Sequence, residues 1–263
     1  MGKYYYLIAG LQELQLDDSK VPVAVDQFRE EVYEALTGSD RKLMDLLLLE
    51  NDCRNFIGSE RMEELAGYVK QQEPCPAGTP QFMYDFVQEW LDDSWHEYAE
   101  FAEDRLWSLF YDYAAHCGNE FVQDWYRFNL DLNNIQTAIT ARKYDLDVRR
   151  MLVGDNEITQ ALRTSGARDW GLSQEVPFWD DIMRLQEASD LNDRERKTDL
   201  LRWQWLEEHC FFHYFTIERL FSYMVCLGMV ERWCAMDAEK GQQLLRKLIG
   251  TLKDQTEVPA EFK

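Results

Sequence analysis

Apolar residues recur every three or four positions along most of this chain, the spacing that places side chains on one face of a helix. In the stretch VDQFREEVYEAL, residues Phe28, Val32 and Leu36 fall on such a face. We expect Asp26 to cap the start of this helix and Gly38 to mark its end. This stretch therefore predicts an amphipathic helix of about three turns.

The same pattern continues between two breaks, EPCPAGTP and RTSGARDWGLSQEVPF, where prolines and glycines interrupt it. Strand-like alternation over four or more residues is missing beyond the opening segment, so the pattern predicts an all-α fold. We expect a central helix at 39–52, which starts with Ser39 and Asp40 as caps. Within 82–116 we expect helical turns on each side of Asp92 and Asp93, and 121–146 should be one helix or two joined by a bend. The other helices that we expect are 59–72, a short helix after 158, 178–187, one long amphipathic stretch over 190–235, and 241–252.

The opening segment YYYLIAGLQEL, residues 4–14, fits two interpretations. Helical spacing would put Tyr4, Leu7, Ile8, Leu11 and Leu14 on one stripe, whereas a strand would alternate Tyr4, Tyr6 and Ile8 with Tyr5 and Leu7. Tyrosine favours strands and leucine favours helices, so both interpretations stay open. The segment lacks a signal-peptide cleavage pattern, and we expect it to belong to the mature fold.

Composition narrows the class of protein. The chain has 263 residues, 46% of them hydrophobic and nine of them tryptophan, which is enough for a globular core. Its most apolar stretch, 211–230, contains Glu218 and Arg219 and predicts a buried helix, with no direct insertion into a membrane. The six cysteines form no CxxC pair, which favours reduced thiols in a cytoplasm.

Charge argues against two classes of partner. The formal net charge of −21 repels nucleic acid and anionic lipid at long range, and no basic cluster with interleaved aromatic residues stands out in the sequence. We therefore expect no nucleic-acid binding, and we expect partners that are neutral or basic.

Two patterns could carry metal chemistry. The carboxylates Asp93, Glu97, Glu100 and Asp104 have the spacing of a magnesium-binding helix, with Asp180 and Asp181 as a second half. However, the sequence has no DDxxD motif and no gathered cations to hold a diphosphate, and an acidic solvated face explains the same residues.

His209 and His213 have the spacing of a zinc pair on one helical face but lack the glutamate of HExxH, so a place in or near the core explains them better. Neither a nucleophile elbow nor a P-loop is present in the sequence. We therefore predict no catalytic residue, no metal and no cofactor.

A short motif of the form D-x-x-N followed by an apolar residue occurs twice in the chain. It comprises Asp52 and Asn55 in the first copy, and Asp131 and Asn134 in the second.

The second copy lies in FNLDLNNIQTAITARKYDLDVRRMLVGDNEI, residues 128–158, which resembles a segment of the C/d family of rotary V-type ATPase subunits, named C in bacteria and archaea and d in eukaryotes. The stretch FTIERLFSYMVCLGMVERWCAMDAEKG resembles the C-terminal helix of that family, and the opening residues resemble its aromatic first element. The matching positions are Tyr4, Tyr6, Leu7, Asp131, Asn134, Ile135, Ala141, Arg142, Glu218, Tyr223 and Glu231.

This resemblance, closest to a short bacterial form, implies a mechanical function. It implies a single funnel-like domain of repeated helical lobes, about 1–75, 80–165 and 175–263. A protein of this family is a non-catalytic linker of the central stalk, which joins the central shaft to the membrane rotor ring during ion transport. It would be cytoplasmic and peripheral to the inner membrane. The motif positions, with Asp52 and Asn55, would then be structural or would contact other subunits.

Two other functions remain open on the sequence. One is an all-α magnesium-dependent enzyme that acts on a diphosphate through Asp93, Glu97, Asp180 and Asp181. The other is an acidic scaffold that binds one basic protein without a rotary role.

Overall fold

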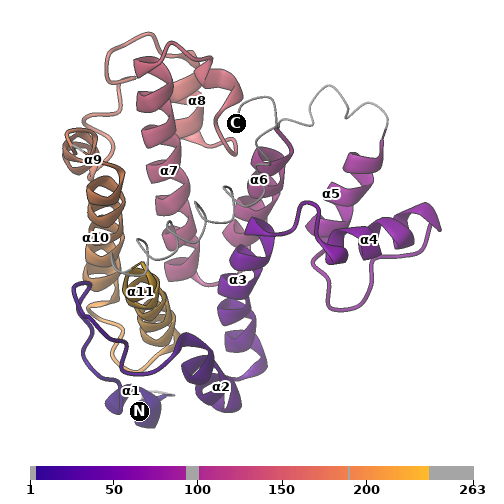
Figure 1. Cartoon of the computed structure of the whole chain (residues 1–263), viewed down its shortest axis with the longest axis vertical. Helices are drawn as coiled ribbons and strands as arrows, with labels where there is room; N and C mark the ends of the chain where they lie inside the picture. Colours follow the sequence, from indigo (N-terminus) through magenta and orange to yellow (C-terminus); the bar gives the residue numbers. More distant parts are fainter. Residues whose placement is uncertain (1–3, 93–100, 189, 237–263) are drawn as a thin grey trace, which may run out of the picture. The chain divides into compact units, whose positions relative to one another are not determined.

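The computed structural model describes residues 4–92, 101–188 and 190–236, and every regular element in these ranges is a helix (Figure 1). The all-α prediction is therefore confirmed for the described part of the chain. The expected helix over 241–252 lies outside the described residues. No helix within the described ranges combines the length and the apolarity that a membrane crossing requires.

The chain divides into two compact units. Unit 1 combines the two ends of the chain, residues 1–36 and 213–263, and unit 2 is the continuous segment 37–212. The division into three lobes stays a prediction.

Unit 1 contains one long helix, and both ends of the chain contribute to the unit. Its helices are α1 (Tyr5–Ala9), α2 (Val25–Ala35) and α11 (Ile217–Ala235). Helix α2 packs against α11, and the rings of Phe28 and Tyr223 lie 5.0 Å apart. The opening segment thus contains a short helix, which decides between the two interpretations of its pattern.

Unit 2 is organised around its longest helix. Its elements in chain order are α3 (Gly38–Arg54), α4 (Glu60–Lys70), α5 (Gln81–Leu91), α6 (Ala102–Ala115), α7 (Glu120–Lys143), the 3-10 helix η3 (Val148–Arg150), α8 (Glu157–Thr164), α9 (Trp179–Gln186) and α10 (Leu191–Cys210). Helix α7 contacts α6, α8, α9, α10 and η3, and its buried side chains extend around most of its circumference. It is therefore the central element of this unit, and it is one continuous helix.

Polar side chains join α7 to α10. Arg202 donates from Nε to Oδ1 of Asn129 over 2.8 Å and from Nη2 to Oδ1 of Asn133 over 3.0 Å. Gln136, one turn further along α7, donates to Thr198 Oγ1, one turn earlier along α10. These pairs fix the register of two antiparallel helices, because each is satisfied only in one alignment.

Three helix limits differ from the sequence expectation. The stretch 190–235 is two helices, with a break between Cys210 and Ile217, because its aromatic residues continue the apolar pattern where the backbone leaves the helix. Helix α2 begins at Val25, so Asp26 lies in its first turn and Ala24 takes the N-cap position. Gly38 does not end α2, which stops at Ala35, but is the first residue of α3, so Ser39 and Asp40 lie in the first turn of α3.

Candidate functional site

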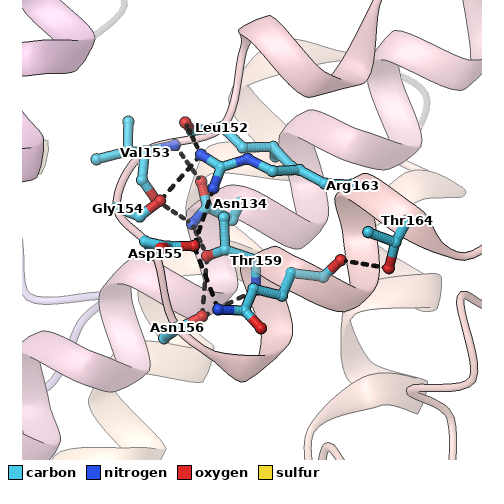
Figure 2. Close-up of polar contacts among 10 residues, drawn as sticks. Asn134, Leu152, Val153, Gly154, Asp155, Asn156, Thr159, Arg163 and Thr164 are labelled. Atoms are coloured by element: carbon cyan, nitrogen blue, oxygen red, sulfur yellow. Dashed lines mark hydrogen bonds and ion pairs between the residues drawn. The ribbon is translucent and has the colours of Figure 1, made fainter.

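The motif residue Asn134 holds the loop that joins η3 to α8 (Figure 2). Its side-chain amide forms two opposed hydrogen bonds with the backbone of Val153: Nδ2 donates to the carbonyl over 2.8 Å, and Oδ1 accepts from the amide over 2.9 Å. The same Nδ2 donates to Thr159 Oγ1 over 3.2 Å. Asn134 is almost fully buried, so these bonds replace water that its amide has lost. We call residues 152–156 the anchored loop.

Asn156 connects the anchored loop to the other motif residue of α7. Its Oδ1 accepts from the amide and the hydroxyl of Thr159, as the N-cap of α8, and its Nδ2 donates to Asp131 Oδ1 over 2.7 Å. Burial raises the pKa of Asp131 to about 6, although the Asn156 amide and the nearby Arg127 guanidinium both act to lower it. Asp131 therefore accepts a bond that holds the loop, while burial disfavours its charged form.

Arg163 holds the same loop from the α8 side. Its Nη2 donates to the carbonyls of Leu152 and Gly154 over 3.1 and 2.9 Å, and its Nη1 pairs with Asp155 (Figure 2). Gly154 has a φ of +74°, and a Cβ there would approach a methyl of Leu130 to 3.2 Å. The loop is thus held on both sides in a conformation that favours glycine.

The other motif positions of α7 also have structural contacts. Ile135 and Ala141 are fully buried. The Arg142 guanidinium lies 3.5 Å from the centre of the Trp170 ring and donates to the carbonyl of Arg168 over 2.5 Å. Arg142 therefore ties the end of α7 to the segment between α8 and α9.

The first D-x-x-N copy has different surroundings from the second. Asp52 pairs with Arg61 of α4, and both side chains are partly exposed. Asn55 follows the last residue of α3 and donates to the carbonyl of Asn51 over 3.2 Å. The two copies share a spacing, but only the second copy lies mid-helix and holds a distant loop.

The motif positions of α11 support unit 1. Glu231 accepts a hydrogen bond from the Val25 amide over 3.1 Å, at the N-terminus of α2, where a carboxylate also complements the helix dipole. Tyr223 lies against Phe28, and its hydroxyl interacts with the backbone of Gln12. Glu218 lies 3.6 Å from His213. Each of these side chains joins the helix to a segment from outside it.

The opening motif separates into buried and exposed positions. Tyr4 is buried and its amide donates to the carbonyl of Phe215 over 3.3 Å, whereas Leu7 is half-buried. Tyr6 is 93% exposed, beside Tyr5, whose ring lies 4.8 Å from that of Phe215. Tyr214 is 62% exposed and precedes Phe215 directly in the chain. We call Tyr5, Tyr6, Tyr214 and Phe215 the aromatic surface of unit 1.

One family model, described as "Protein of unknown function (DUF2764)", matches residues 1–256. The chain belongs to the DUF2764 family. It matches no curated protein and no solved structure. Membership in DUF2764 therefore assigns no activity, and a function has to be argued from the residues themselves.

The metal patterns of this DUF2764 chain are not assembled in its described part. Asp93, Glu97 and Glu100 lie outside the described residues, while Asp104 is on α6 and Asp180 and Asp181 are on α9. His209 Nδ1 bonds the carbonyl of Trp205 over 2.8 Å, and the two rings are stacked. Among residues 4–92, 101–188 and 190–236, no group of three His, Cys, Asp or Glu side chains is placed to hold a metal.

Several supporting residues of this DUF2764 fold are absent from the sequence expectations. Asn156, Thr159 and Arg163 complete the contacts of the anchored loop. Asn156 before the first turn of a short helix is a typical N-cap, and this signal could have identified it. The bonds of Asn134 and Arg163 to distant carbonyls have no sequence signature.

Proposed function

We propose that this DUF2764 chain is a non-catalytic linker in the central stalk of a rotary V-type ATPase, between the central shaft and the membrane rotor ring. The proposal rests on the resemblance of its motifs to the C/d family and on the use that the fold makes of those motif positions. A linker of this kind needs stiffness and specific surfaces, and it needs no reacting group.

The main support is the contrast among the motif positions. Asn134, Asp131, Arg142, Tyr223 and Glu231 all join elements of their own unit. These contacts give the helices defined positions, because a polar bond across two elements is lost when either element shifts. Such residues suit a part that transmits force.

The motif position Tyr6 differs from these, because its side chain is almost wholly exposed. Tyrosine is enriched among the residues that dominate binding energy at protein interfaces. Three exposed tyrosines beside Phe215 give unit 1 a concentrated aromatic area, which is typical of a protein-binding surface. We propose that the aromatic surface contacts one of the rotor proteins.

Purification of the native assembly tests the function. The tagged chain, isolated in mild detergent from the cells that make it, should bring the shaft and ring proteins with it. Recovery of the chain alone, or with an unrelated basic protein, would contradict the rotary function.

Variants test the surface separately from the function. Tyr6→Ala with Tyr214→Ala should reduce recovery of the rotor proteins by about tenfold or more, as expected for residues that dominate an interface. Leu191→Ala is the matched control, because Leu191 is a similarly exposed apolar residue on α10 of unit 2. If both variants recover the rotor equally well, the function stands and the assignment of the aromatic surface is wrong.

A further inference from the structure

The end of α7 carries a group of cations that contrasts with the rest of this acidic chain. We call it the basic tip of unit 2: Arg142, Lys143, Arg149, Arg150 and Arg168, together with the apolar side chains of Tyr144, Leu146 and Met151. All eight residues are exposed, as are Asp145 and Asp147 of the same stretch, so cations outnumber carboxylates here in a chain whose net charge is −21. Arg168 is included because its backbone carbonyl accepts a hydrogen bond from the Arg142 guanidinium.

Most cations of the tip have no carboxylate partner. In the described part of the chain, no ion pair involves Arg142, Lys143, Arg149 or Arg168, and Arg150 has only a 3.6 Å contact with Asp147. Arginines elsewhere are commonly paired, as Arg54 is with Glu50 and Arg105 is with Glu89. In a chain with 49 acidic residues against 28 basic ones, several unpaired cations at one place are unexpected.

Helix stability explains only part of this group. Arg142 and Lys143 lie in the last turn of α7, where cations complement the helix dipole. Arg149, Arg150 and Arg168 lie beyond that helix and gain nothing from its dipole. Neither does the dipole account for the exposure of Tyr144 and Leu146, at 63% and 50%.

The backbone of the tip is held in place before any partner binds. The Leu146 amide donates to the carbonyl of Ala141 over 2.9 Å, and Asp147 caps η3 by accepting from the Arg149 amide. Arg149 Nε donates to the carbonyl of Arg163, and the anchored loop follows directly along the chain. A surface fixed in this way loses less conformational entropy on binding than a mobile loop would.

We propose that the basic tip binds a short acidic segment of a partner protein, with Tyr144 and Leu146 contacting an apolar side chain within it. The unpaired cations supply charge complementarity, and the apolar residues supply contact area. This partner differs from the neutral or basic one that the net charge of −21 predicts, because the cations of the tip act at short range. Nucleic acid and anionic membranes fit less well, because the long-range repulsion grows with the charge of the partner. This proposal does not require the rotary function.

Site-specific photo-crosslinking in the full chain tests the proposal. A photoreactive phenylalanine derivative in place of Tyr144 would be irradiated in living cells, and the crosslinked peptides would be identified by mass spectrometry. The expected product is a protein segment with an excess of Asp and Glu. Its yield should fall at least fivefold in 0.5 M salt in a cell extract, because salt screens exposed charges.

Charge reversal provides the decisive comparison. Lys143→Glu with Arg168→Glu should reduce the crosslink at least fivefold, whereas Lys42→Glu with Lys70→Glu, which changes the net charge equally at exposed positions of α3 and α4, should leave it unchanged. Circular dichroism would establish that both double variants fold. If Lys143→Glu with Arg168→Glu does not fold, Lys143→Gln with Arg168→Gln takes its place.

Four outcomes would overturn the proposal: crosslinks mainly to lipid or nucleic acid, crosslinks to segments without excess carboxylates, equal yields in the two double variants, or no crosslink from position 144.

Discussion

Asn134 and Asp131 lie one turn apart on α7 and contribute differently to the anchored loop. Asn134 presents a neutral amide whose donor and acceptor both meet the backbone of Val153. Asp131 presents a buried carboxylate that accepts from Asn156. Removal of the first leaves buried polar groups without partners, whereas neutralisation of the second removes a charge that burial disfavours.

Asn134→Ala should lower the free energy of unfolding by about 2 to 4 kcal/mol, because the carbonyl and amide of Val153 and the hydroxyl of Thr159 lose a shared partner. Urea denaturation followed by circular dichroism measures this change. Asn55→Ala is the matched control from the first D-x-x-N copy, where the exposed side chain makes one local bond, and it should cost less than about 1 kcal/mol. Equal losses in the free energy of unfolding would show that the two copies of the motif contribute similarly to stability.

The stability of the chain should depend on pH through Asp131. Its pKa is about 6 in the folded chain, against an ordinary value of 3.8. Between these values the folded state holds more protons than the unfolded state, so the contribution of Asp131 decreases as pH rises from about 4 to about 6. The contribution is complete below this window, and the largest loss above it is about 3 kcal/mol.

Asp131→Asn should remove this dependence while the new carboxamide oxygen still accepts from Asn156. We expect the variant to be at least as stable as the natural chain at pH 7 and to have a flatter profile between pH 4 and 6. Thermal unfolding across that range measures both effects, with Asp45→Asn at an exposed position of α3 as control. A loss of stability confined to pH values above about 6, where Asp131 is charged, would mean that the carboxylate charge itself is required.

At the scale of helices, the apolar spacing predicted most elements of the described chain and missed places where aromatic residues leave the core. Period-3.6 patterns predicted helices that bury one face, such as α2, α4 and α6, and also α7, which is buried around most of its circumference. The break before α11 was missed because Phe211, Phe212 and Tyr214 extend the apolar run, although their rings are exposed. A local sequence pattern contains the residue types, but it does not show which side chains other elements bury.

Helix starts were also hard to predict where the capping group comes from elsewhere. No local side chain accepts at the start of α2, and Glu231 of α11 accepts from Val25 instead. A sequence window around Asp26 cannot contain this information, because the two residues are far apart along the chain.

Glu231→Ala should lower the free energy of unfolding of α2 by about 1 kcal/mol, since the Val25 amide loses its acceptor and the helix N-terminus loses a negative charge. Hydrogen exchange of the amides in 25–35 measures this change, which should be a faster exchange of about fivefold. Glu231→Gln keeps an acceptor oxygen, so its exchange rates should lie between those of the natural chain and those of Glu231→Ala. Glu34→Ala, an exposed change in the same helix, is the control. Unchanged exchange in Glu231→Ala would exclude this role.

At the scale of the whole molecule, the two units differ in how the chain builds them. Unit 2 is one continuous segment with its own central helix, and α7 finds its contacts to α6, α8, α9 and α10 within it. Residues 37–212 should therefore fold without the rest of the chain. The expected result is a helical circular dichroism spectrum and cooperative thermal unfolding.

A shorter fragment provides the control for this prediction. Residues 37–175 lack α9 and α10, which contact α7, and should unfold with little cooperativity. A disordered 37–212 fragment would mean that unit 2 needs unit 1 for stability.

The candidate surfaces could be predicted from sequence only in part. The motif resemblance selected Tyr6, and the structure shows that its side chain is exposed. The sequence pattern does not single out the basic tip, because Asp145 and Asp147 lie between its two pairs of neighbouring cations. Arg168 reaches the tip only through its contact with Arg142, which the fold creates.

The composition of unit 1 from both ends of the chain has a consequence for biosynthesis. On the ribosome, α2 emerges early, but Tyr223, against which Phe28 packs, is translated only after all of unit 2. Throughout that interval the apolar face of α2 lacks its native cover, while unit 2 can already complete its core. A nascent chain stalled after residue 212 would therefore present Phe28 and Val32 to chaperones, and synthesis of α11 would end that exposure.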